Sequence, residues 1–166
     1  MPLADTLIME LEREAKTTRR VLERVPTDKL TWKPHVKSMS LGRLAQHVAT
    51  IPGAISGMAK SDSYDVANFS EPPELESTGA ILDAFEDNIA QAKANLSATD
   101  DAAMMKDWSC IMAGRPIMTV PRIGLYRSIL LNHLYHHRGQ LSVYLRLLDV
   151  PVPSIYGPSA DENPFA

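Results

Sequence analysis

The spacing of the prolines constrains this chain more than any other feature of its sequence. A proline inside a helix removes a backbone donor and clashes with the preceding turn, so prolines divide a chain into intervals that can be helical. Of the 12 prolines in these 166 residues, only Pro52 lies inside one of the long intervals that the others delimit. Typical globular helices run about 8–20 residues, so these intervals are long enough for helices. The pattern predicts four long helices.

Apolar periodicity places these helices along the chain. In four segments apolar residues recur every three or four positions, as on one buried helix face. The predicted helices cover residues 3–25, 41–58, 78–97 and 121–148. Ser40 and Ser77 precede the second and third segments, and serine is a favoured N-cap because its hydroxyl accepts from a free helical N–H. Pro121 opens the fourth at a favoured first position, and Pro52 predicts a kink in the second.

A short stretch before the last helix has a different pattern. Two apolar runs, at residues 108–112 and 117–120, flank the turn-forming residues 113–116, which predicts a small β-hairpin. A hairpin alone is marginally stable, so we expect it to pack on the helices. The predicted fold class is all-α: a four-helix bundle with a small hairpin before the last helix. Residues 1–150 form a single domain in this prediction, and residues 151–166 form an irregular C-terminal tail.

Charge and composition exclude several kinds of partner. The 17 Lys and Arg against 20 Asp and Glu give a net charge of −3, which offers no field to attract nucleic acid. No run approaches the roughly 20 apolar residues of a membrane span, and the N-terminus lacks the pattern of a secretory signal. The single cysteine, Cys110, cannot form a disulfide within the chain. We therefore expect a cytoplasmic protein without nucleic-acid or membrane partners.

The histidines carry the chemical signal. Three of the five lie between residues 132 and 140, inside the fourth predicted helix. His133 and His137 are four positions apart, so they share one face of that helix, and this face is also the apolar one. His136 falls at the edge of the face. In the second predicted helix His47 likewise lies on the apolar face, whereas His35 lies in a connection.

Three inward imidazoles need a common explanation, because burying one unpaired polar group costs about 1–3 kcal/mol. A divalent ion such as Zn, Ni, Mn or Fe supplies one by accepting a lone pair from each neutral ring. Gln140 and Asn132 lie nearby and could accept the remaining ring N–H groups. Spacing alone leaves open the alternative that these histidines are ordinary hydrogen-bonded core residues.

Three segments carry a resemblance to a known family. They are SLGRLAQH at residues 40–47, HLYHHRGQL at residues 133–141 and RLLDVPVPSIYGPSADE at residues 146–162. With the predicted order of helices and hairpin, the chain resembles the DinB/YfiT superfamily over nearly its whole length. The resemblance implies a four-helix bundle with a crossover connection, usually a homodimer, that holds one divalent ion by three histidines. By position these ligands are His47, His133 and His137.

The resemblance specifies a site better than a reaction. The superfamily includes thiol transferases that act with bacillithiol or mycothiol and a maleylpyruvate isomerase. We expect a metal-dependent enzyme, a thiol or S-transferase or a hydrolase, that acts on a small molecule, with a low-molecular-weight thiol as one candidate. The alternative is a non-catalytic stress-response module whose ion is structural. A third interpretation, an apolar-ligand binder, depends on methionines that more often fill a core; these are Met58, Met104, Met105, Met112 and Met118.

Other residues could contribute beside the histidines, although the sequence assigns no catalytic residue. His136 could act as a general base, and Arg43 could bind an anionic substrate. The tail could fold over the mouth of the site, and an aspartate after the second helix could add a ligand. The residues concerned are Tyr156 and Asp161 in the tail and Asp62 and Asp65 after the helix. For each residue the simpler interpretation is a solvated surface side chain.

Overall fold

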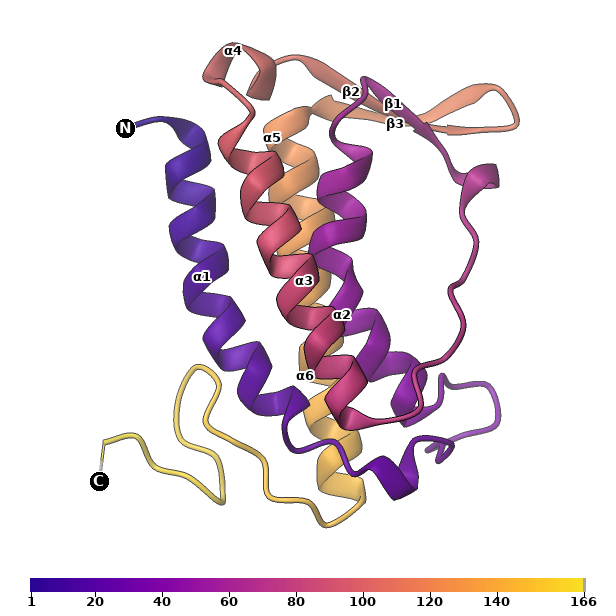
Figure 1. The fold of residues 1–166 in the computed structure, drawn as a ribbon, viewed down its shortest axis with the longest axis vertical. Coiled ribbons are helices and arrows are strands. Elements are labelled where there is room, and N and C mark those ends of the chain that lie inside the picture. The colour runs from indigo at the N-terminus through magenta and orange to yellow at the C-terminus, as the bar shows by residue number, and fades with distance from the viewer. Residues whose placement is uncertain (166) are drawn as a thin grey trace.

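The computed structural model describes residues 1–165, which are mostly helical with a small sheet at one end (Figure 1). Four long helical rods make up most of the molecule. The first three are α1 (Leu3–Leu22), α2 (Leu41–Met58) and α3 (Thr78–Ser97), and the last is the continuous run of α5 (Arg122–Gly124), η3 (Leu125–Leu131) and α6 (Asn132–Leu147). These bounds confirm the four predicted helices. No helix in residues 1–165 has both the length and the apolarity needed to cross a membrane.

The connection between α2 and α3 follows from the directions of the rods. Helices α2 and α3 run in the same direction, whereas α1 and α6 run in the opposite one (Figure 1). Parallel neighbours cannot be joined by a tight turn, so residues 59–77 return along the flank of the molecule. This is the crossover connection that the family resemblance implies. It contains a short strand at residues 63–65 and the short helix η2 (Val66–Asn68), and the rest is irregular chain.

The predicted hairpin is confirmed and belongs to a larger sheet. Its turn is Ala113-Gly114, with φ of 50° and 73°, the left-handed region that a tight two-residue hairpin turn requires. A short third strand from the crossover pairs in parallel with the first hairpin strand, a pairing between distant segments that the local pattern did not predict. The strands are β1 (Ser63–Asp65), β2 (Asp107–Met112) and β3 (Arg115–Pro121), in the order β1-β2-β3.

Two buried side chains fix the sheet on the helices. Trp108 is 2% exposed, and its indole N–H donates to the carbonyl of Met58 at the end of α2 (3.1 Å). Arg122 is 5% exposed and donates to the carbonyl of Ala59 (2.8 Å), while its guanidinium pairs with Asp62 (2.6 Å). Asp62 therefore pairs with Arg122 near the end of α2, and the possibility that it adds a metal ligand is not supported.

The last rod differs from the predicted continuous helix. Residues 125–131 form a π-helix, in which the N–H of Asn132 bonds to the carbonyl of Arg127, five positions back. Such segments are rare, and they occur often at functional sites because they re-aim the side chains beside them. Here the π-helix directly precedes the turn that carries His133. Proline and apolar spacing give no signal for it.

The core lies among the four rods and takes the apolar faces that periodicity predicted. Pro52 is inside α2, which continues to Met58, so the predicted kink stays a prediction. Of the methionines considered for ligand binding, Met104 is fully buried, whereas Met105 and Met112 are more than half exposed. They do not form one surface. The largest fully buried apolar side chains include Leu11, Leu22, Leu41, Leu44, Ile81, Phe85, Tyr126 and Leu130.

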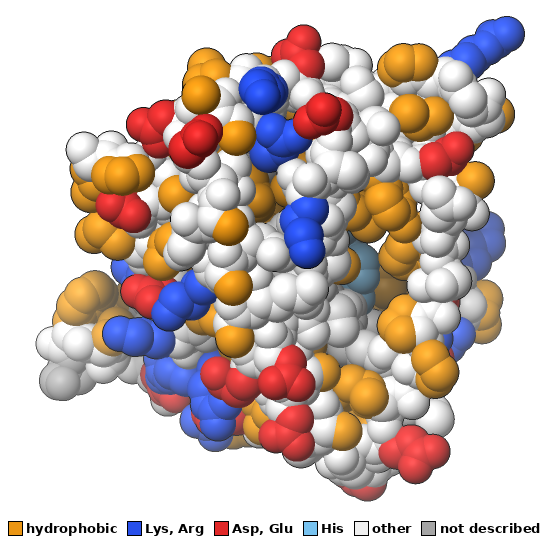
Figure 2. Space-filling model, turned by 45° about the horizontal axis from the view of Figure 1, so that its top comes forward, with side chains coloured by type: hydrophobic (Ala, Val, Ile, Leu, Met, Phe, Trp, Pro, Cys, Tyr) orange, Lys and Arg blue, Asp and Glu red, His pale blue; other side chains and the backbone are white. Residues whose placement is uncertain are grey.

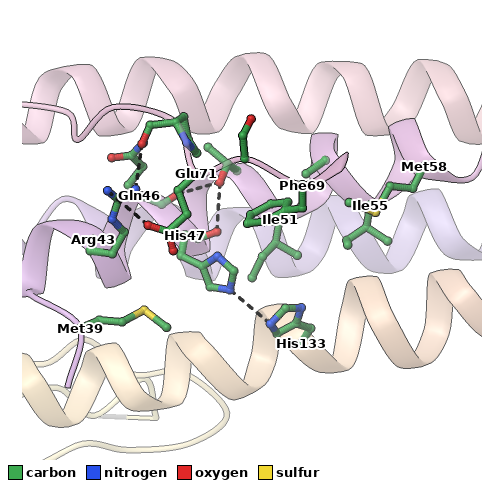
Figure 3. A pocket seen from close by; sticks show the side chains of 14 residues that line it. Met39, Arg43, Gln46, His47, Ile51, Ile55, Met58, Phe69, Glu71 and His133 are labelled. Carbon is green, nitrogen blue, oxygen red and sulfur yellow. Dashed lines mark hydrogen bonds and ion pairs between the residues drawn. The ribbon is translucent and has the colours of Figure 1, made fainter. Parts of the chain in front are cut away.

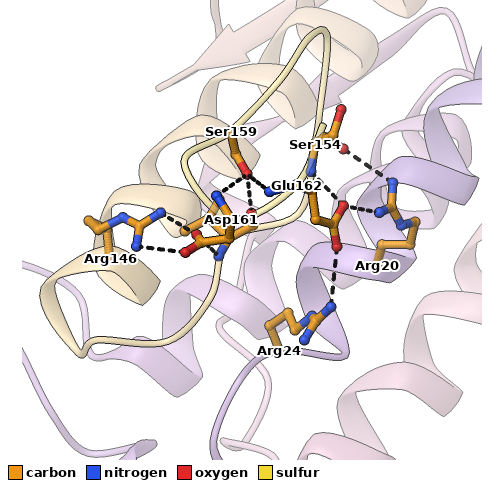
Figure 4. A network of polar contacts seen from close by, with 8 residues as sticks. Arg20, Arg24, Arg146, Ser154, Ser159, Asp161 and Glu162 are labelled. Carbon is orange, nitrogen blue, oxygen red and sulfur yellow. Dashed lines mark hydrogen bonds and ion pairs between the residues drawn. The ribbon is translucent and has the colours of Figure 1, made fainter. Parts of the chain in front are cut away.

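The described part of the tail, residues 151–165, has no helix or strand, yet defined contacts hold it (Figure 4). The Glu162 carboxylate pairs with Arg20 of α1 and with Arg24 just after it, and it accepts from a backbone N–H of the tail. The Asp161 carboxylate pairs with Arg146 of α6 and accepts from another. Two acidic side chains thus attach the tail to α1 and α6.

This placement argues against the possibility that the tail covers the mouth of a histidine site. The Tyr156 hydroxyl donates to the Glu14 carboxylate of α1 (2.9 Å). Asp161 lies against Arg146 instead of a histidine. Tyr156 therefore contacts α1 and Asp161 contacts α6, and the crossover approaches the histidines in their place.

Candidate metal centre

The three histidines selected from the sequence converge between α2 and α6. His47 projects from α2, and His133 and His137 project from successive turns of α6. Each offers a ring nitrogen, and these three atoms lie within 4.8 Å of one another. The Nε2 atoms of His47 and His133 are 3.2 Å apart, and the ring centroids are separated by 4.5–5.0 Å. Metal binding by these three histidines remains a prediction.

Hydrogen bonds outside the cluster orient two of the rings. The Nδ1 of His137 lies 2.7 Å from the amide oxygen of Gln140. An amide oxygen only accepts, so Nδ1 carries the proton and Nε2 keeps its lone pair. The ring of His133 bonds to the backbone of Ile129, inside the π-helix. The predicted role of Gln140 is thereby supported, while Asn132 is exposed and makes no recorded hydrogen bond to a histidine of the described chain.

Burial keeps these imidazoles neutral at pH 7. It is the main cause that lowers the pKa of His47 to about 4, and the neighbouring His137, His133 and Arg43 lower it further. Burial is also the main cause of the lowered pKa of His133 and of His137. A neutral imidazole is the form that binds a metal ion. The donor atoms, their protonation and their convergence therefore fit a divalent ion.

The other titratable candidates lie apart from the cluster. His136 is exposed, and its ring faces that of His137 from outside, with 4.8 Å between the centroids. His35 is exposed in the connection before α2, where its Nδ1 accepts from the backbone N–H of Lys37. The Asp65 carboxylate caps η2. Neither aspartate after α2 joins the three histidines, so neither adds a ligand in this arrangement.

A cavity of about 480 Å³ opens on His47 and His133. It lies between α2 and the crossover, and Figure 2 shows an imidazole at the base of an opening surrounded by apolar side chains. Of the five methionines considered from sequence, only Met58 is among the described lining residues. Sequence reasoning missed this cavity, because its roof is the irregular crossover.

Two residues of α2 hold the roof in place (Figure 3). The Gln46 side chain is 4% exposed; its amide donates to the carbonyl of Pro73 (2.8 Å) and accepts from the N–H of Leu75 (2.9 Å). Arg43 donates to the carbonyl of Pro72 (2.9 Å) and lies within 4 Å of two crossover carboxylates. The guanidinium is thus already paired, which favours the surface ion-pair interpretation of Arg43 over a free anion site. Gln46 was not singled out from the sequence.

Comparisons with known proteins identify the family of this chain. The model of the DinB family matches residues 1–164. The chain is 26% identical over 159 residues to the uncharacterized protein YrdA of Bacillus subtilis strain 168, covering 95% of this chain and 90% of YrdA.

Solved structures show the same fold. A DinB-like protein from Bacillus cereus superposes with a TM-score of 0.70 at 21% identity, over 93% of this chain and 98% of that one. The DinB-like protein YjoA of Bacillus subtilis gives a TM-score of 0.71 at 18% identity, over 90% of this chain and 97% of that one. With the family match over nearly all residues, the conclusion is direct: this chain belongs to the DinB family.

Proposed function

We propose that this protein is a divalent-metal-dependent enzyme with a four-helix-bundle fold and His47, His133 and His137 as the ligands. The observation that carries the proposal is the cavity that opens on two of these histidines. Structural metal sites are closed by four protein ligands, whereas catalytic sites keep a position open toward substrate. Three converging nitrogens beside a cavity match the second kind.

The donor set narrows the choice of ion. Imidazole nitrogens suit zinc, nickel and iron, while manganese prefers oxygen ligands. When bound, such an ion supplies Lewis-acid chemistry to water or to a thiol, which corresponds to a hydrolase or to a thiol transferase. We propose zinc, nickel or iron as the native ion.

The protein's own residues would prepare this site. Gln140 holds the His137 ring in the tautomer that presents Nε2, and burial keeps His47 unprotonated. Gln46 and Arg43 hold the crossover over the cavity, which limits the access of bulk water. Among the described lining residues Glu71 is the one carboxylate, and it lies 3.6 Å from Arg43.

The first test is elemental analysis of untagged protein beside the His133→Ala/His137→Ala variant. We expect about one zinc, nickel or iron ion per chain in the wild type and none in the variant. His35→Ala, which changes a histidine remote from the cluster, should retain the ion. Wild type that takes up none of these ions on addition would refute the metal site. Sedimentation of the same samples tests the homodimer that the family resemblance implies.

A second test separates a catalytic ion from the structural alternative. Protein loaded with Co²⁺ should change its visible spectrum when azide or a small thiol is added, because a new ligand enters the coordination sphere. The same additions to Co²⁺-loaded His136→Ala should give the same change, since His136 lies outside the cluster. A spectrum that does not respond would assign the ion a purely structural role.

A further inference from the structure

We propose that the cavity beneath residues 69–72 selects a small molecule with an apolar body and a single polar head, and that the head faces His47 and His133. This substrate class rests on the proposed function, because a head group that meets the histidines is the part on which a bound ion would act. The walls of the cavity further determine the chemical character of the rest of the substrate.

The shape and walls of the cavity define the apolar body. Its volume of about 480 Å³ lies within the range of roughly 300–1,000 Å³ typical of small-molecule sites. Side chains of α2 form one wall, and Met39 and the crossover residue Phe69 lie across from it (Figure 3). The apolar lining consists of Met39, Ile51, Ala54, Ile55, Met58, Phe69 and Pro72.

Three polar side chains of the α2 wall are already paired within the protein. The side-chain amide of Gln46 hydrogen-bonds to the crossover backbone through both its nitrogen and its oxygen. Arg43 pairs with a crossover carbonyl and carboxylates. The Thr50 hydroxyl donates to the carbonyl of Gln46, one turn back (3.0 Å). None of these three groups needs a ligand, so the wall offers few partners to polar atoms along a ligand's body.

Polar recognition is therefore concentrated at one end of the cavity. The lining histidines, His47 and His133, bring their Nε2 atoms within 3.2 Å of each other. Each polar atom of a ligand body that enters the apolar part without a partner costs about 1–3 kcal/mol. This argues against a polyhydroxylated or polycarboxylated thiol filling the cavity. It favours an alkyl or aryl body attached to a thiol, carbonyl or carboxyl-like head.

The experiment measures the affinity of zinc-loaded protein for a series of n-alkyl hydroxamates by calorimetry, with the zinc content of each sample determined in parallel. Each added methylene should strengthen binding about fourfold until the chain fills the cavity. Gluconohydroxamate has the six carbons of hexanohydroxamate but a polyhydroxylated body, and it should bind more than about 10-fold more weakly. Affinity independent of chain length, or gluconohydroxamate that binds as well as hexanohydroxamate, would overturn the proposal.

A pair of variants locates the effect. Ala54 lines the cavity and is exposed to it, so Ala54→Trp should fill the space and abolish the dependence on chain length while acetohydroxamate still binds. Ala90 is an exposed alanine of α3 outside the cavity, and Ala90→Trp should leave the whole series unchanged. A chain-length dependence that survives Ala54→Trp would place the apolar site elsewhere and refute the proposal.

Metal-free protein separates this proposal from the proposed function. Binding of n-alkanols needs no metal, and their affinity should rise with chain length and be lost in Ala54→Trp. If zinc does not bind but this pattern holds, the apolar cavity stands and the metal-dependent enzyme fails. If zinc binds but neither series depends on chain length, the cavity proposal fails and the metal centre stands.

Discussion

Helix α6 carries two polar clusters on different faces, and they are built in opposite ways. Toward α1 it presents Arg138, which is 1% exposed and lies 2.8 Å from the carboxylate of Glu14, itself 4% exposed. The Arg138 guanidinium also donates to the Thr18 hydroxyl (3.1 Å) and lies over two tyrosine rings. Toward α2 the same helix presents His133 and His137.

The difference lies in where each polar group finds its partner. A charged group of the opposite sign meets Arg138, so the two buried charges of that cluster are paired within the protein. The histidines meet other histidines, which repel a proton from one another and leave lone pairs pointing to a common centre. A cluster whose charges are paired contributes to the packing of helices, whereas a cluster whose lone pairs have no partner is available to an ion. Four predictions test this distinction, from the largest expected effect to the smallest.

Replacement of Arg138 by Met should destabilise the fold without weakening the metal centre. It leaves the Glu14 carboxylate buried without its cation, which typically costs about 3–5 kcal/mol. Urea unfolding of metal-free protein measures the loss, and a zinc titration of the folded variant should match the wild type. The double variant Arg138→Met/Glu14→Leu should recover much of the loss, because two apolar side chains pack without an unpaired charge. A single variant as stable as wild type would contradict the role of this pair.

Replacement of His137 by Ala should have the converse effect. Loss of a residue that only orients a metal ligand lowers metal affinity about 10–100-fold. Loss of the ligand itself should therefore lower zinc affinity by more than roughly 100-fold. The free energy of unfolding of the metal-free variant should change less than in Arg138→Met. His136→Ala is the matched control, since His136 is the exposed neighbour on the same helix. Equal losses of zinc affinity in these two variants would remove His137 from the site.

Replacement of Gln140 by Ala should give a smaller loss of zinc affinity, about 10–100-fold, because it frees the His137 ring without deleting a ligand. Gln140→Glu keeps an acceptor for Nδ1–H and should lose less. Asn132→Ala, which removes an exposed amide on the same helix, should bind zinc as the wild type does. Competition with a chromophoric chelator measures all three, and an unaffected Gln140→Ala would show that the ring needs no such support.

The smallest effect, at most about 1.4 kcal/mol for each pH unit, concerns pH. In the folded chain the pKa of His47 is lowered to about 4 from its ordinary value of 6.5, so between these values the unfolded chain binds more protons. Stability of metal-free protein should therefore be greatest above about pH 6.5 and fall as the pH decreases toward 4. His47→Gln should flatten this dependence, and Arg138→Met should keep it. A wild-type profile without a slope in this window would contradict the burial of His47.

The sequence predicted features that depend on neighbouring residues. Ser40 and Ser77 cap α2 and α3 as expected, because an N-cap bond joins residues three positions apart. The pair His133 and His137 followed from helical spacing, and His47 from the apolar face of another helix. Their convergence therefore needed only the assumption that both faces meet in one core.

Features that depend on distant segments were not predicted. Strand β1 exists because the crossover passes β2, and the cavity exists because the same crossover is fastened to Gln46. The tail gave no periodic signal, and ion pairs such as that between Glu162 and Arg20 join residues more than 100 positions apart. The π-helix before His133 has no spacing rule by which to recognise it.

The anchors of the crossover bear on how proteins of this architecture diverge. The side chains of Gln46 and Arg43 hydrogen-bond to backbone atoms of Pro72, Pro73 and Leu75. A backbone carbonyl or N–H is still present when the side chain of its residue is exchanged. Substitutions at Phe69 or its neighbours can therefore reshape the roof without loosening these bonds. Selection can then alter which molecules fit the cavity while the three converging histidines stay constant. A lineage with this layout can acquire new substrates one loop residue at a time.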